Sequence, residues 1–194
     1  VNDWHVVHLG SRAAGGTGLI ITEMTDIAPE GRISEGCAGI YKPEHVDAWA
    51  RVVDFVHTHS DAKIAIQLAH AGRKASCEVA WEGGRPLPEE RAWEIIAPSA
   101  IPFSESSQTP RQMTDEDMER LIDAFGQGAR WANDAGFDMI ELHGGHGYLI
   151  SSFISPLSNT RNDQYGGTLE NRMRYPLAIF HAVRKNWPDE KPIS

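Results

Sequence analysis

The sequence has few of the features that mark disulfide-rich, secreted or membrane-spanning proteins. Only two of its 194 residues are cysteines, Cys37 and Cys77, and they form no C-x-x-C motif, which argues against a disulfide framework or a zinc knuckle. No apolar run approaches the roughly 20 residues that cross a bilayer, and the residues after Val1 do not resemble a signal peptide. We therefore expect a cytoplasmic protein with no membrane partner.

Positive charge is also scarce. The chain carries 18 basic and 27 acidic residues, a formal net charge of −9, which repels nucleic acid and favours small-molecule chemistry. We expect a small-molecule substrate and no nucleic-acid partner. Assembly into a homo-oligomer is left open. The composition, 41% hydrophobic and 23% charged, is typical of a packed globular protein, so residues 1–194 are interpreted as one domain.

Short apolar strands alternate with amphipathic helices along the chain. Each strand follows a turn or helix-stop signal, and such alternation is typical of an α/β protein with a parallel sheet. The expected strands are residues 18–23, 63–68 and 137–142, with a further strand opening at 191–194. The expected helices are residues 43–58, 114–135 and 169–186. A further helix is expected before the first strand.

The first strand distinguishes between an open nucleotide-binding sheet and a closed barrel. Glu23-Met24-Thr25-Asp26 stands where a dinucleotide-binding fold would carry its glycine-rich loop, so a (β/α)8 barrel is favoured. Two long connections, residues 69–112 and 143–168, follow predicted strands. In such a barrel they lie at the carboxyl ends of the strands, where active sites are built.

The clearest chemical motif is Glu141-Leu142-His143-Gly144-Gly145-His146-Gly147-Tyr148, at the end of a predicted strand. Two imidazoles three residues apart, His143 and His146, can direct two hydrogen-bond donors at one substrate oxygen and polarise a carbonyl group. Tyr148 is close enough in sequence to donate a proton to a neighbouring carbon. This pattern predicts a catalytic site.

Other interpretations of this motif stay open from the residues alone. The two histidines could be structural and satisfy loop hydrogen bonds. They could also ligate zinc or iron with Glu141 nearby, in a metal-dependent barrel hydrolase, although the spacing is not that of H-E-x-x-H on a helix. A degenerate barrel that serves as a binding module is the third alternative.

Two further segments carry polar side chains in unusual places. Gln67 interrupts an otherwise buried strand, and its amide needs partners, which a flavin ring or a neighbouring strand could supply. The segment 155–174 is rich in turn residues and charge. Within it, Arg161 and Asp163 are expected to form a buried ion pair that stiffens the rim.

At these segments the sequence resembles the Old Yellow Enzyme family of NAD(P)H:flavin oxidoreductases. The resemblance rests on residues 67–73 (QLAHAGR), residues 143–149 (HGGHGYL) and the long segment 155–174. It implies a partial (β/α)8 barrel, with about strands 2 to 4 and their helices, and FMN as cofactor. It also implies NADH or NADPH as hydride donor and an activated alkene as acceptor.

The same resemblance implies a role for each site residue. Gln67 matches the contact to the flavin pyrimidine, and the backbone near Met24 matches a contact to the flavin edge. His143 and His146 match the pair that anchors a substrate carbonyl or nicotinamide over the flavin. Tyr148 matches the usual proton donor.

Details at residues 29–32, 37–41 and 81–83 resemble the reductase domain of bifunctional enzymes acting on salicylyl-CoA or 2-aminobenzoyl-CoA. That likeness implies a dearomatised aryl-CoA thioester as substrate. The family's first strand, a flavin-contacting arginine and the phosphate-binding loops have no counterpart within residues 1–194. We expect a piece of a longer protein that by itself is inactive and binds FMN weakly.

Overall fold

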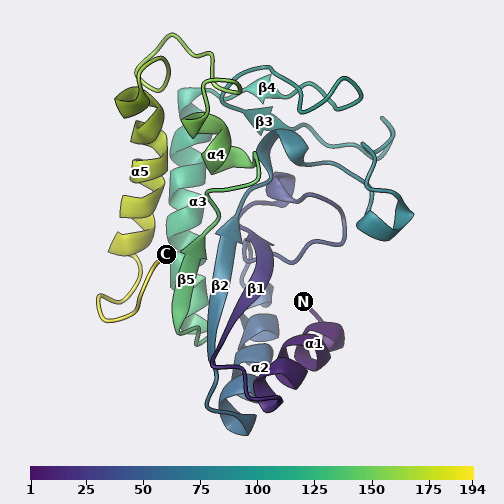
Figure 1. Cartoon of the computed structure of the whole chain (residues 1–194), viewed down its shortest axis with the longest axis vertical. Coiled ribbons are helices and arrows are strands. Elements are labelled where there is room, and N and C mark those ends of the chain that lie inside the picture. The colour runs from purple at the N-terminus through teal and green to yellow at the C-terminus, as the bar shows by residue number, and fades with distance from the viewer.

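The structure, a computed structural model, describes all residues from Val1 to Ser194. It is built on three parallel strands with helices packed against one face (Figure 1). The main strands are β1 (Leu19–Asp26), β2 (Lys63–Ala69) and β5 (Met139–Leu142). The helices are α1 (Asp3–Ala14), α2 (Glu44–His59), α3 (Asp115–Asp134), α4 (Leu149–Ile154) and α5 (Leu169–Lys185). Two short strands, β3 (Ile96–Ala97) and β4 (Arg111–Gln112), form a separate pair.

The sheet has the order β1-β2-β5, with both strand pairs parallel. The last residues of the chain continue it, because Ile193 bridges Ile140 in parallel and the Leu142 amide donates to the Ser194 carbonyl at 2.8 Å. The opening of a further strand at 191–194 is therefore confirmed. Strands that follow one another in chain order around a parallel sheet are the arrangement of a (β/α)8 barrel.

The two faces of this sheet carry different residues. Ile64, Ile66, Leu68 and Ile140 are fully buried against the helices, in the main hydrophobic core. Because successive side chains in a strand point to opposite faces, Met24, Gln67 and Glu141, which are paired in register, share the other face. We call this second face the inner face.

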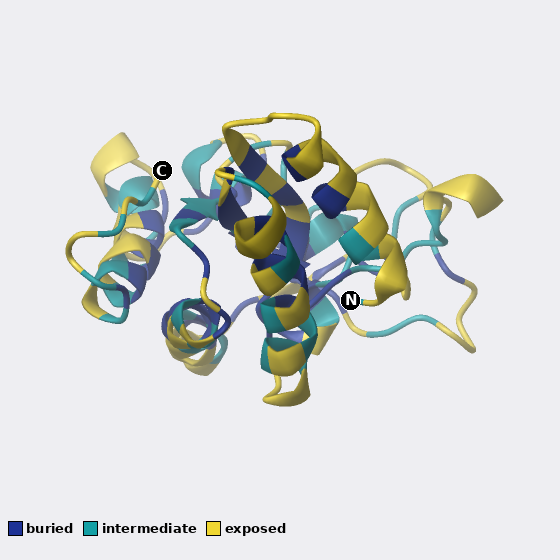
Figure 2. Ribbon diagram, turned by 90° about the horizontal axis from the view of Figure 1, so that it is seen from below, coloured by how far each residue is buried: buried dark blue, intermediate teal, exposed yellow.

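Helix α3 illustrates why the local sequence gives this fold. Thr114 accepts a hydrogen bond from the Asp117 amide while the Asp117 carboxylate accepts from the Thr114 amide, a reciprocal cap for the first turn. Met118, Leu121 and Phe125 then recur at helical spacing and are buried. The helices are thus buried along one side and exposed along the other (Figure 2).

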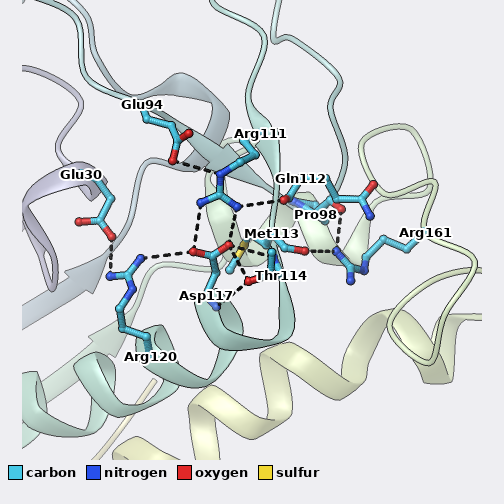
Figure 3. A network of polar contacts seen from close by, with 10 residues as sticks. All are labelled: Glu30, Glu94, Pro98, Arg111, Gln112, Met113, Thr114, Asp117, Arg120 and Arg161. Carbon is cyan, nitrogen blue, oxygen red and sulfur yellow. Dashed lines mark hydrogen bonds and ion pairs between the residues drawn. The ribbon is translucent and has the colours of Figure 1, made fainter.

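The connection from residue 69 to 112 is ordered rather than a plain loop, because an ion pair ties it to α3. Arg111, in β4, lies between Glu94 of the same connection, at 3.1 Å, and Asp117 of α3, at 2.6 Å (Figure 3). The Arg111–Asp117 pair holds the strand pair β3-β4 against the start of α3. Arg120 of α3 separately reaches Glu30, in the segment after β1, at 2.6 Å.

The segment 155–174 is fixed to the same region by Arg161. Its guanidinium donates to the carbonyls of Pro98 and Met113, at 3.1 and 2.8 Å, and pairs with Asp163 at 2.6 Å (Figure 3 shows the two carbonyl contacts). Arg161 is buried whereas Asp163 is largely exposed. The predicted ion pair is confirmed, but it is not buried as expected, because only its arginine is buried. The additional partners of Arg161 explain how the rim is stiffened.

Three elements were not expected from the sequence: β3, β4 and α4. The two strands have only two residues each, too short for a period to be read, and α4 spans only six residues. The expected strand at 18–23 also extends further, to Asp26. No helix of the chain combines the length and the apolar character needed to cross a bilayer.

Candidate active site

The predicted site residues meet at the carboxyl ends of β1, β2 and β5. On the inner face Met24 pairs with Gln67, and Gln67 pairs with Glu141. A register shift between Ile21 and Met24 interrupts the β1-β2 ladder, and there the Gln67 amide donates to the Thr22 hydroxyl at 3.1 Å. The bulge thus aligns Met24 with Gln67.

Gln67 has the polar groups that the edge of a flavin ring requires. Its side-chain nitrogen donates to Glu141 at 2.5 Å, which leaves a second N–H and the amide carbonyl free on a half-buried side chain. A donor beside an acceptor complements the adjacent carbonyl and N–H of a flavin pyrimidine. The residues present therefore fit FMN. The predicted alternative, a hydrogen bond between barrel strands, is present as well.

The two histidines of the motif are hydrogen-bonded to each other. The Gly145 amide donates to His143 Nδ1 at 3.2 Å, so the His143 proton resides on Nε2, which faces His146 Nδ1 at 3.1 Å. Only His146 Nε2 then remains as an outward donor. This differs from the expectation that both imidazoles direct donors at one external oxygen.

The two histidines differ in backbone conformation and in burial. His146 has a left-handed φ of 58° and is exposed, whereas His143 is buried. Burial, together with the positive charge that His146 can carry, lowers the pKa of His143. His143 is therefore a neutral donor at physiological pH, suited to hydrogen bonding rather than to charge pairing.

Tyr148 completes an aromatic cluster with the two histidines. Its ring centroid lies 4.9 Å from that of His143 and 6.1 Å from that of His146, each pair nearly perpendicular. The residue immediately precedes α4, which Figure 1 shows beyond the end of β5. Burial, followed by the nearby Cys37 and Asp26, raises the pKa of Tyr148, so the phenol keeps its proton at neutral pH.

Lys74 is a residue of this site to which the sequence pointed only indirectly. Its Nζ lies 4.8 Å from the Tyr148 ring centroid and donates to the His146 carbonyl at 3.1 Å. No carboxylate pairs with it. Lys74 directly follows the motif 67–73, which is the only sequence signal that could have identified it.

A cavity of about 530 Å³ adjoins the aromatic cluster. Lys74 lines the cavity and also contacts Tyr148, so it forms the boundary between the two. On its other side Lys74 lies 4.5 Å from the centroid of Phe103, and Trp81 and Arg73 line the same space. The cavity can take an extended ligand whose reactive end reaches the cluster.

The interpretation of His143 and His146 as metal ligands finds no support. No group of three or more histidine, cysteine, aspartate or glutamate side chains is arranged to hold a metal ion. The ring nitrogens that face each other in the histidine pair are moreover used in a mutual hydrogen bond.

Comparisons with known proteins agree with this geometry. The family of NADH:flavin oxidoreductases and NADH oxidases matches residues 1–193. An NADPH dehydrogenase of Geobacillus sp. (strain WCH70) is 51% identical over 187 residues, which cover 96% of this chain and 51% of that protein. A second, of Clostridium acetobutylicum, is 46% identical over 193 residues, covering 100% and 53%.

Solved structures share the fold of this chain. Old Yellow Enzyme from Pichia sp. AKU4542 superposes with a TM-score of 0.87 at 32% identity, covering 100% of this chain and 50% of that one. A 2-naphthoyl-CoA reductase in complex with 2-naphthoyl-CoA superposes with a TM-score of 0.87 at 28% identity, covering 100% and 29%.

The chain spans about half the length of the NADPH dehydrogenases it matches. Its parallel strands and their helices, which superpose on Old Yellow Enzyme, form part of a (β/α)8 barrel. The histidine pair and the phenol lie at one end of that barrel, beyond the carboxyl end of β5. On the match over residues 1–193, the chain belongs to the NADH:flavin oxidoreductase / NADH oxidase family.

Proposed function

We propose that the protein carrying this chain is an FMN-dependent oxidoreductase that passes hydride from NADH or NADPH to an activated alkene. The observation that carries the proposal is the cluster of His143, His146 and Tyr148, which follows β5, the strand whose Glu141 accepts from the inner-face amide of Gln67. NADPH is favoured as donor, because the relatives are NADPH dehydrogenases.

FMN, when bound, supplies the hydride chemistry. In this proposal Gln67 holds the flavin through its free amide N–H and carbonyl, and the β1 backbone near Met24 lies along the flavin edge. Both residues lie on the inner face, in register with each other. The protein's own contribution is to bind, orient and protonate the substrate.

The histidine pair binds the carbonyl oxygen of the substrate. His146 Nε2 offers an outward donor, while His143 Nε2–H is engaged with His146. A second donor becomes available when substrate replaces that bond. Donors aimed at the carbonyl oxygen stabilise the negative charge that develops there during hydride addition.

Tyr148 supplies the proton to the second alkene carbon. Its raised pKa keeps the phenol protonated until the substrate carbon becomes basic. The Lys74 ammonium over the ring then stabilises the phenolate left behind.

Replacing Tyr148 by Phe tests this function in the FMN-loaded protein. Loss of a general acid slows a reaction by roughly 10²–10⁴-fold, so rapid-mixing experiments with an enone such as 2-cyclohexenone should show alkene reduction slowed by about that factor. Reduction of the flavin by NADPH should keep its rate, because that step needs no proton from Tyr148. Equal slowing of both steps would contradict the assignment.

Tyr165→Phe is the matched control. Tyr165 packs against Tyr175 at 6.4 Å between ring centroids, away from the histidine pair. Removing its hydroxyl should leave both steps unchanged.

We also propose an acyl-CoA thioester as the natural substrate class. The observations that favour it are the likeness to a reductase that binds 2-naphthoyl-CoA and the cavity beside Lys74. Comparing kcat/KM for a cyclic enoyl-CoA with that for the free enone tests it. A thioester that is reduced no better than the free enone would contradict it.

A cytoplasmic location and a homo-oligomeric assembly stay predictions.

A further inference from the structure

The cavity beside the aromatic cluster contains positive charge that no carboxylate of the chain neutralises. Arg73 and Lys74 both line it. The Arg73 guanidinium donates only to the Pro102 carbonyl, at 3.3 Å, and its Nε is buried without a hydrogen-bond partner. Lys74 Nζ donates only to the His146 carbonyl, at 3.1 Å. Because a partly buried charge without a counter-ion is unfavourable, an anion that enters this cavity is stabilised there.

The acidic residues of the cavity are already paired. Glu23 and Glu78 are the carboxylates that line it. Glu23 lies 3.2 Å from His5, and Glu78 lies 3.1 Å from Arg85. The chain as a whole carries a formal net charge of −9, so the free charge of the cavity is opposite in sign to that of the protein. A ligand with phosphate groups is therefore directed to this place on the molecule.

Arg73 is suited to hold a phosphate group. Burial lowers the pKa of its guanidinium, but an arginine stays charged throughout the physiological range. Its planar fork of N–H groups matches two phosphate oxygens at once. Phe103 keeps the two cations together, because the Arg73 guanidinium lies 5.8 Å and Lys74 Nζ 4.5 Å from the centroid of its ring.

Trp81 provides a flat apolar surface at the same cavity. It lies in the single helical turn Ala80–Glu82 and is 83% exposed although it lines the cavity. Only one end of the indole is close to Gly36, where a Cβ atom would lie 3.9 Å from Trp81 Cη2. A large exposed indole beside a phosphate site is a surface on which a nucleic-acid base can stack.

We propose that this cavity binds the adenosine-phosphate portion of a substrate, with the phosphates on Arg73 and the purine stacked on Trp81. Its volume of about 530 Å³ is within the usual range for ligand pockets. Lys74 lies 4.8 Å from the ring centroid of Tyr148, so the other end of the same molecule reaches the reacting groups. An acyl-CoA thioester and NADPH both contain this portion, and for these two sources the inference rests on the proposed function.

Calorimetric titration of the FMN-loaded protein with ADP tests the binding itself. Arg73→Gln and Trp81→Ala should each weaken ADP binding by about tenfold or more, since each removes one of its two contacts. Glutamine can still donate to the Pro102 carbonyl, and Trp81 is too exposed to contribute to the core. No ADP binding, or the parent's affinity in either variant, would overturn the inference.

The matched controls lie on α1, outside the cavity. Arg12 is exposed and, like Arg73, donates to a backbone carbonyl, that of His8. Trp4 is 67% exposed. Arg12→Gln and Trp4→Ala should bind ADP as the parent protein does.

Kinetics then identify which substrate uses the cavity. In both cavity variants, kcat/KM for a cyclic enoyl-CoA and the concentration dependence of flavin reduction by NADPH are compared with those of the parent. A loss confined to the thioester assigns the cavity to coenzyme A, a loss confined to NADPH assigns it to the hydride donor, and a loss in both means shared use. The reduction of 2-cyclohexenone, which has no adenosine, should keep its rate. If neither adenosine-containing substrate were affected, the inference would be wrong.

These measurements fail independently of the proposed function, because ADP binding involves no hydride transfer. Variant-sensitive ADP binding together with unchanged alkene reduction in Tyr148→Phe would leave the adenosine site standing and the proposed function refuted. Absent ADP binding together with slowed alkene reduction in Tyr148→Phe would mean the reverse.

Discussion

Two buried titratable side chains, Asp26 and His70, lie at the ends of adjacent strands and respond to burial in opposite senses. Burial raises the pKa of Asp26 and lowers that of His70 to about 4. Both shifts favour the neutral form. The acid and the imidazole thus avoid the free-energy cost of a buried charge while remaining polar.

His70 provides a pH prediction. Its Nδ1 accepts from the Gly72 amide at 3.0 Å, while its Nε2 has no partner. Because the folded pKa of about 4 lies below the ordinary 6.5, the unfolded chain binds the proton first as pH falls. The contribution of His70 to stability is therefore complete above pH 6.5 and is lost between pH 6.5 and 4. The shift corresponds to about 3 kcal/mol.

His70→Asn tests this prediction, because an asparagine oxygen can still accept from the amide two residues on. Urea unfolding at pH 7 and pH 4 should show a smaller loss of stability in the variant than in the parent protein. His181→Asn, at an exposed site on α5, should keep the parent's loss. A variant with the parent's full pH dependence would show that another group is responsible.

At the scale of elements, the long connections at the rim hold the site through close backbone contacts. Gly72 has a left-handed φ of 58°, and a Cβ atom there would lie 3.1 Å from the backbone of Leu149. The Leu149 amide in turn donates to the His70 carbonyl at 3.0 Å. The end of β2 is thereby fixed to the start of α4, directly beside Tyr148.

Gly72→Ala should therefore disturb both stability and site. Gly16 is a matched control, because it also has a positive φ, 91°, but a Cβ atom there would meet nothing within 4 Å. Gly16→Ala should cost about 1 kcal/mol in the free energy of unfolding, for the backbone conformation alone. Gly72→Ala should cost clearly more in urea unfolding. Equal losses would show that the contact with Leu149 adds nothing.

The same elements show what the sequence could predict and what it could not. The Thr114 cap and the apolar period of α3 are local signals, so that helix was predicted within a residue. The mutual hydrogen bond of His143 and His146 was not, because it depends on ring orientations set by a left-handed residue. Asp26 was noted only as part of a segment lacking glycine, since its burial depends on the fold of distant residues.

At the scale of the whole molecule, β2 is the central strand of the sheet and links the core to the candidate site. It pairs with β1 on one side and β5 on the other, and Ile64, Ile66 and Leu68 are fully buried beneath the helices. Its inner face carries Gln67, and its end leads into Lys74 at the site boundary. The central strand of the sheet, buried against the helices, therefore also positions the functional residues.

Hydrogen exchange can test that central role. Amides that exchange only through global unfolding are protected by the full free energy of unfolding, about 5–15 kcal/mol for a typical domain, whereas exposed loops exchange through small local openings. The β2 amides, Lys63–Ala69, should therefore be among the slowest in the protein, and those of residues 102–109, which lie outside every helix and strand, among the fastest. Mass-spectrometric exchange on overlapping peptides measures both in one experiment. If β2 exchanged as fast as residues 102–109, the sheet would open locally, and a rigid inner face holding Gln67 against a flavin would be untenable.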